Sequence, residues 1–142
     1  MRHSVKKLVC AFACTLIILG LSIGIIVNAS NSESVSNAFC TLYGFSYVEW
    51  DNYPQYYVDV ISYTIDQYAY NVDQIQAVGD VFIDDVFIGR LDDFEFNTWQ
   101  AEKELYSSGA GSILGIDSFH YANKSNFSGP LSTYTYDYVI YP

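Results

Sequence analysis

The feature that most constrains this chain is the regular alternation of its side chains in stretches of about ten residues. In residues 56–65 (YYVDVISYTI), even-numbered positions share one face of an extended strand and odd-numbered positions share the other. Tyr, Val, Ile, Phe and Thr dominate the chain from Phe39 onward, and these side chains suit a pleated sheet. A helical period is hard to find, so the sequence predicts an all-β protein.

Turn-forming residues divide this part of the chain at intervals typical of a β-sandwich. The second half of residues 94–107 (QAEKEL) has helix-forming composition, but its first half alternates, and we predict a strand. About seven strands predict an immunoglobulin-like antiparallel β-sandwich over residues 39–142. The expected strands are residues 41–50, 56–70 (one strand or two), 74–83, 86–91, 94–107, 113–122 and 131–141.

The N-terminal residues 1–29 are predicted to enter a membrane. Residues 8–27 carry no charge, follow the basic Arg2, Lys6 and Lys7, and should form a hydrophobic helix. Small residues before Ser30 favour a cleaved signal peptide, whereas the length of the apolar run favours a retained membrane anchor. Either alternative places the rest outside the cytoplasm, and polar residues 30–38 are expected to be a flexible spacer.

The charge of the chain excludes some partners. The formal net charge is −10, and all 16 acidic residues follow residue 29. Only Arg90, Lys103 and Lys124 are basic in that part. Because Lys and Arg supply most of the affinity for phosphate backbones, we expect no nucleic-acid binding, and contact with a membrane only through the N-terminal segment.

Cys40 is the lone cysteine of the expected domain, so no internal disulfide is predicted there. Its thiol is either buried as a small apolar group or free to form an intermolecular disulfide, which would support a homo-oligomer. With His120 it could also form a Cys-His hydrolase, but no neighbour in sequence would activate the thiol. We expect instead that His120 hydrogen-bonds to a neighbouring strand, with mild acid sensing as an alternative.

Aspartates gather near one predicted hairpin, on both sides of residues 86–91. Oxygen ligands on loops suit calcium, whose extracellular sites are often weak. The candidate calcium ligands are Asp84, Asp85, Asp92 and Asp93. No twelve-residue EF-hand spacing is present, and solvated carboxylates at strand ends are the ordinary explanation.

Aromatic residues are abundant, with 14 Tyr, 9 Phe and 2 Trp. Tyr134, Tyr136 and Tyr138 share one face of the last predicted strand. Exposed tyrosines offer apolar area and a hydroxyl at low entropy cost, as in adhesive or sugar-stacking surfaces. Trp50 and Trp99 are predicted core anchors, and Trp99 is also a candidate binding residue beside the tyrosines.

The order of features in the C-terminal part resembles that of small exported β-sandwich proteins of Gram-positive bacteria. The resemblance rests on Ile75–Gly89 (IQAVGDVFIDDVFIG), the glycine-rich Ser107–Gly111, His120 and the Ser/Thr/Tyr-rich Ser132–Tyr138. It implies export and a sandwich fold, and it implies no activity and no site residues.

These observations predict an exported, non-enzymatic binding or cell-surface module without a cofactor. Its partner would be an extracellular protein or carbohydrate, bound through the tyrosine-rich face or through an edge strand. A secreted effector of bacteriocin-like or toxin-like type is the alternative, and the hydrolase comes third. The location is extracellular, or the outer face of the membrane if residues 8–27 are retained.

Overall fold

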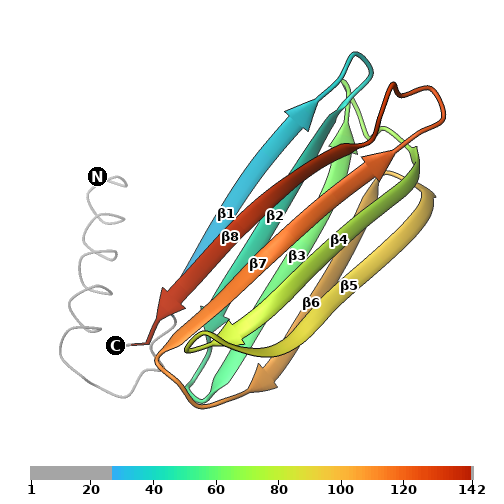
Figure 1. Cartoon of the computed structure of the whole chain (residues 1–142). Helices are drawn as coiled ribbons and strands as arrows, with labels where there is room; N and C mark the ends of the chain where they lie inside the picture. The colour runs from blue at the N-terminus through green and yellow to red at the C-terminus, as the bar shows by residue number, and fades with distance from the viewer. Residues whose placement is uncertain (1–26, 142) are drawn as a thin grey trace, which may run out of the picture.

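The computed structural model describes residues 27–141, which form two four-stranded antiparallel sheets packed face to face (Figure 1). Sheet I contains, in spatial order, β1 (Val27–Ser36), β2 (Thr41–Trp50), β3 (Gln55–Ile65) and β6 (Gln100–Ser108). Sheet II contains β5 (Val86–Thr98), β4 (Val72–Ile83), β7 (Ile113–Asn123) and β8 (Leu131–Ile140). The prediction of an all-β, antiparallel sandwich is therefore confirmed.

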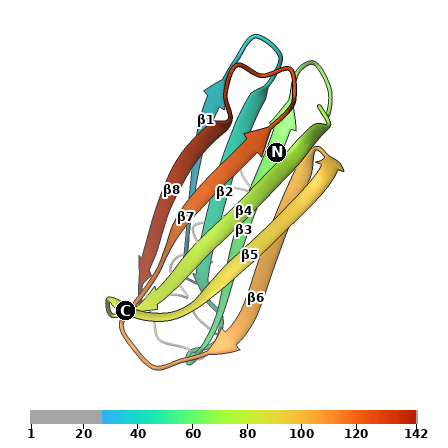
Figure 2. The same cartoon turned by 45° about the vertical axis from the view of Figure 1, so that its right-hand side comes forward.

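The two sheets face each other (Figure 2), and side-chain alternation determines which residues fill the space between them. In β2 every even-numbered residue is buried, and every odd-numbered residue is partly exposed on the outer face. Trp50 is fully buried and confirms its predicted role, while Trp99 is 37% exposed between β5 and β6, so the core prediction for Trp99 is wrong. The other large, fully buried apolar residues are Leu42, Val48, Val58, Val60, Val72, Ile75, Val81, Leu114 and Ile116.

The polar spacer predicted at residues 30–38 is wrong for residues 30–36, which belong to β1. This strand pairs with β2 along its whole length, from Val27 opposite Trp50 to Ser36 opposite Thr41. Ala29 and Val35 pack against the core, while the intervening serines lie on the outer face. Backbone pairing needs no apolar side chains, so a serine-rich segment can form an edge strand when only two of its residues contact the core.

The predicted leader or anchor lies outside the described residues, apart from residues 27–29, which begin β1. Within residues 27–141 no helix could cross a membrane. The predicted break at residues 92–93 is also wrong, because β5 continues through both aspartates to Thr98. The chain leaves sheet II only at Trp99, just after Asn97 adopts a positive φ of 54°.

Both open sides of the sandwich are bridged by a side chain from the opposite sheet. On one side, Asn31 of β1 donates its amide to the carbonyl oxygen of Tyr136 on β8, at 3.0 Å. On the other side, the backbone N–H of Glu102 on β6 donates to Asp93 of β5, at 2.9 Å. Because these contacts occupy backbone groups of two edge strands, they oppose pairing with a foreign strand there.

Candidate functional site

Two hollows lie on the outer face of sheet II, and together they are called the groove. Its lower part holds about 250 Å³ and lies over Gly115, between β4 and β8. Its upper part holds about 500 Å³ between Arg90 and Tyr134. Asp117 and Tyr136 line both parts, so the two hollows adjoin along the sheet.

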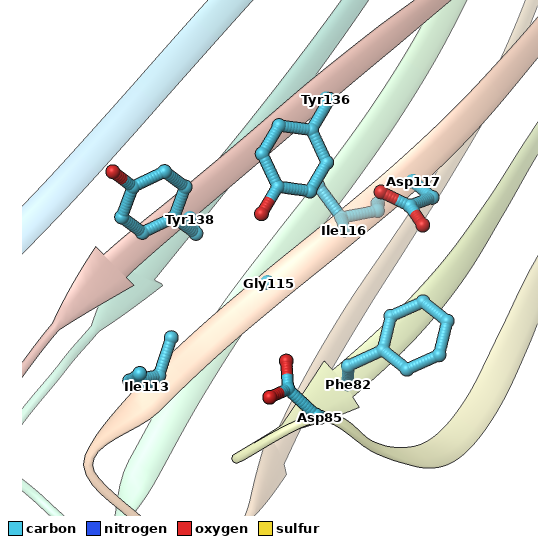
Figure 3. A pocket seen from close by; sticks show the side chains of 8 residues that line it. All are labelled: Phe82, Asp85, Ile113, Gly115, Ile116, Asp117, Tyr136 and Tyr138. Carbon is cyan, nitrogen blue, oxygen red and sulfur yellow. The ribbon is translucent and has the colours of Figure 1, made fainter.

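Figure 3 shows how the side chains of four segments produce the lower part of the groove. Tyr136 and Tyr138 project from β8 on one side, and Phe82 from β4 stands on the other. Gly115 of β7 pairs with both Phe82 and Tyr138, and its missing side chain leaves the space between them open. A Cβ there would meet its nearest atoms at 3.5 and 3.6 Å, which are ordinary contacts, so the backbone tolerates a larger residue.

Charged groups lie along the floor of the upper part. Arg90 donates two hydrogen bonds to Asp80, at 2.6 and 2.8 Å, and this bidentate contact holds the pKa of the Asp80 carboxyl below its ordinary value. Asp117 lies opposite Asp80 in the register of β7 and β4 and is exposed. The groove therefore offers a fixed ion pair and an exposed carboxylate to a ligand.

The tyrosine stripe predicted from the sequence lines this groove. Tyr134, Tyr136 and Tyr138 are 69%, 59% and 51% exposed. Their rings are held by neighbours, because Tyr134 packs on Phe119 at 5.1 Å between ring centroids and Tyr136 on Tyr138 at 5.7 Å. Trp99 lies at the β5–β6 connection, across the sheet from β8, so the structure does not bring it to the tyrosines.

The four aspartates proposed as calcium ligands do not meet. Asp84 and Asp85 form the β4–β5 turn, whereas Asp92 and Asp93 lie seven or more residues along β5, about 20 Å away. Asp84 accepts the backbone N–H groups of Ser112 and Ile113, and thereby holds the loop before β7. Within residues 27–141 no three acidic, histidine or cysteine side chains form a metal-binding group, so the calcium prediction is not supported by the geometry.

Asp92 and Asp93 each have a structural partner on a different face of β5. Asp92 accepts a hydrogen bond from the Gln76 amide at 2.8 Å on the outer face. Asp93 forms the contact between the sheets described above. Successive residues of a strand point to opposite faces, so two adjacent carboxylates cannot converge on one ion.

Cys40 is buried, with 4% of its surface exposed, and burial raises the pKa of its thiol. This is the buried alternative of the two that the sequence leaves open. A buried, protonated thiol is a poor nucleophile and cannot reach another chain while the β1–β2 hairpin is closed. The geometry therefore supports neither an intermolecular disulfide nor hydrolase chemistry at Cys40.

His120 is fully buried between the sheets and confirms the expected hydrogen bond to neighbouring strands. Its Nδ1 lies 2.9 Å from Ser62 Oγ on β3, and its Nε2 lies 2.8 Å from Thr135 Oγ1 on β8. The Ser62 hydroxyl donates its proton to the Gln76 carbonyl, so it accepts from Nδ1, and Nε2 accepts from Thr135. Burial lowers the pKa of His120 to about 4, which keeps the ring neutral at mild pH and opposes the acid-sensor alternative.

The sequence-based prediction missed most of the groove, namely Phe82, Arg90, Gly115, Asp117 and Phe119. Their positions in the alternation assign them to outer faces, but alternation within one strand does not indicate which strands are neighbours. Comparison of the chain with protein-family models, curated proteins and solved structures found no match. The site must therefore be interpreted from its own geometry.

Proposed function

We propose that this protein is an exported, non-enzymatic binding module whose groove on sheet II holds an extended carbohydrate. The observation that carries the proposal is that two hollows adjoin on one face, with Asp117 and Tyr136 in the lining of both. A groove with aromatic walls and a few convergent polar groups is the usual form of a small-ligand site.

Carbohydrate fits the chemistry of the lining better than other ligand classes. Sugar rings present C–H faces that pack on aromatic rings such as Tyr136 and Tyr138, and hydroxyls that donate to carboxylates such as Asp117. The formal charge of −10 disfavours anionic polymers, so the expected ligand is neutral. Pairing of an edge strand with a partner is less well supported, because side chains bridge both open sides of the sandwich.

The scaffold of this module is proposed to be immunoglobulin-like over β2–β8. In the seven-stranded constant-type order, the first, second, fifth and fourth strands form one sheet and the third, sixth and seventh form the other. Strands β2–β8 follow this order with one difference: the fourth strand, β5, lies beside the third strand, β4, in the second sheet. Strand β1 is an additional strand beside β2. Export is supported by the uncharged residues 8–27, for which a hydrophobic helix is proposed.

A non-enzymatic role is supported by the state of the two residues suited to nucleophilic catalysis. The Cys40 thiol is buried and protonated, and both ring nitrogens of His120 are occupied by hydroxyl groups inside the core. Neither residue lines the groove.

Calorimetric titration of the full chain with neutral hexasaccharides of glucose, N-acetylglucosamine and mannose tests this proposal. We expect at least one to bind with a Kd in the micromolar to millimolar range. Gly115→Leu, which fills the groove, and Tyr136→Ala, which removes one wall, should each weaken binding at least about tenfold. Tyr68→Ala is the control, because Tyr68 is 82% exposed in a loop away from the groove.

Failure of all three saccharides to bind would overturn the carbohydrate assignment. Binding that survives both groove variants unchanged would overturn the location of the site.

A further inference from the structure

The outer face of sheet I contains a buried carboxylate that the groove does not use. Asp59 lies in the middle of β3, opposite Tyr47 of β2 and Glu104 of β6. Its neighbours Val58 and Val60 point into the core, so Asp59 points away from it. Even so, only 7% of Asp59 is exposed, and its Oδ1 has no hydrogen-bond partner within the described part of the chain.

The groups around Asp59 are acidic, and they add to the free-energy cost of keeping a buried carboxylate ionised. Burial, followed by the charges of Glu102 and Glu104 on β6, raises the pKa of Asp59 to about 6. Glu49 of β2, two residues from Tyr47, adds another carboxylate to the same face. Like charges on adjacent strands destabilise a sheet, and within the described part of the chain no ion pair offsets these carboxylates.

The basic side chains of residues 27–141 lie elsewhere. Arg90 is paired with Asp80 on the outer face of sheet II, and Lys124 donates to the carbonyl of Asn71 in a loop. Lys103 lies between Glu102 and Glu104 on β6, so it points to the opposite side of the strand. Within residues 27–141, therefore, no basic side chain balances the carboxylates around Asp59.

Two tyrosines flank the buried carboxylate and position its acidic neighbours. The rings of Tyr47 and Tyr57 lie 5.9 Å apart. The Tyr57 hydroxyl donates to Glu104 at 2.9 Å, and the Tyr47 hydroxyl donates to Glu49. Aromatic rings beside carboxylates attract a guanidinium in two ways, since the ring faces stack on its plane and the carboxylates accept its N–H groups.

We propose that Asp59, Glu102, Glu104, Tyr47 and Tyr57 form a second binding site, separate from the groove, that takes an arginine side chain of a basic partner peptide. The guanidinium stacks on a tyrosine ring and donates to Asp59 Oδ1 and to Glu104 together. Because Oδ1 is covered by its neighbours, one flanking side chain must turn aside, and exposed side chains such as Glu102 change rotamer rapidly. Arginine fits this site better than lysine because its planar guanidinium stacks on aromatic rings and donates two parallel hydrogen bonds to carboxylates.

Fluorescence anisotropy of the full chain with labelled tetra-arginine amide at low salt tests this site. Asp59→Asn should weaken binding at least about tenfold, because it replaces the charged carboxylate at the centre of the site with a neutral amide. Asp66→Asn is the matched control, since it removes the same charge from an exposed loop position that lines neither site, and it should change the affinity less than about twofold. Asp59→Asn relieves a buried charge, so the variant is expected to fold.

Tetra-lysine amide, which has the same charge, should bind several-fold more weakly than tetra-arginine amide. Equal losses for Asp59→Asn and Asp66→Asn would show that the peptide responds only to net charge, and would overturn the proposal. Equal affinity of the two peptides would overturn the assignment of an arginine site. The neutral saccharides proposed for the groove should bind equally to wild type and to Asp59→Asn, which separates the two sites.

Discussion

The two outer faces of the sandwich are both rich in tyrosine and acidic residues, but the tyrosine hydroxyls differ in their hydrogen bonding. On sheet I the hydroxyls of Tyr47, Tyr57 and Tyr106 donate to carboxylates of the same face. On sheet II the hydroxyls of Tyr134, Tyr136 and Tyr138 have no hydrogen-bond partner within residues 27–141, and more than half of each side chain is exposed.

For Tyr47 and Tyr57 this difference follows from their position in the sheet. Tyr47 and Tyr57 lie on the interior strands β2 and β3, where neighbours on either side supply acceptors. Burial, followed by the hydrogen bond to Glu49, raises the pKa of Tyr47 to about 12. Tyr136 lies on the edge strand β8, where the bare Gly115 is close by. A tyrosine bonded to its neighbours contributes to stability, whereas an unbonded, exposed tyrosine is available for a ligand.

The largest change in the free energy of unfolding is expected at the core contact between Gly44 of sheet I and His120 of sheet II. A Cβ on Gly44 of β2 would lie 2.2 Å from the His120 ring of β7, and that ring is held by two hydrogen bonds. Gly44→Ala should therefore lower the free energy of unfolding by about 3 kcal/mol, through overpacking and loss of these bonds. Urea denaturation measures this change, and Gly89→Ala, whose Cβ would meet no atom within 4 Å, should lie within about 0.5 kcal/mol of wild type.

Loss of stability in Gly89→Ala equal to that in Gly44→Ala would attribute the effect to glycine itself rather than to the His120 contact.

The second effect is a gain in stability that depends on pH. The folded pKa of Asp59, about 6, lies above the ordinary value of 3.8 for an aspartate, so the folded state binds a proton more readily than the unfolded state. At pH 7.5 the ionised Asp59 therefore lowers the free energy of unfolding by about 2–3 kcal/mol. This penalty disappears as the pH falls through 6 toward 4 and the carboxyl takes up its proton. Asp59→Asn should remove that cost at pH 7.5 and have little effect near pH 4.

Denaturation of Asp59→Asn and wild type across pH 4 to 7.5 measures this difference. Asp117→Asn on the exposed face should stay within about 0.5 kcal/mol of wild type throughout. A constant difference between Asp59→Asn and wild type at all pH values would contradict the buried, ionised state of Asp59.

A third effect, about 1 kcal/mol, should come from a single tyrosine hydroxyl on sheet I. Tyr57→Phe removes a hydrogen bond to the charged Glu104, so the free energy of unfolding should fall by about 1 kcal/mol. A double-mutant cycle with Glu104→Gln isolates the hydroxyl–carboxylate contribution. Additive single effects would mean that the contact contributes nothing to stability.

The smallest effect is expected for the corresponding change on sheet II. Tyr136→Phe removes an exposed hydroxyl without a protein partner, so its free energy of unfolding should equal that of wild type within about 0.5 kcal/mol. Thermal and urea unfolding of this variant beside Tyr57→Phe compare the two faces directly. A loss as large as that of Tyr57→Phe would remove the distinction between a stabilising and a binding face.

Much of the local structure was predictable from the sequence. The alternation in residues 41–50 and 131–141 predicted strands close to β2 and β8, and it placed Tyr134, Tyr136 and Tyr138 on one face. The errors in the predicted strand boundaries lie where the side chains do not indicate whether the backbone is paired. Residues 30–36 are too polar to suggest a strand, and Asp92 and Asp93 suggest a loop although each has a partner on its own side of β5.

The sequence by itself determined an acidic, tyrosine-rich all-β chain with a lone cysteine in its sandwich, because composition and a two-residue period are properties of single strands. Only the tertiary structure decided that Gly115 lies beside Phe82 and Tyr138, that Asp59 is surrounded by carboxylates, and that His120 faces Gly44. These neighbours come from strands distant in the chain, and their pairing depends on how the sheets share the core.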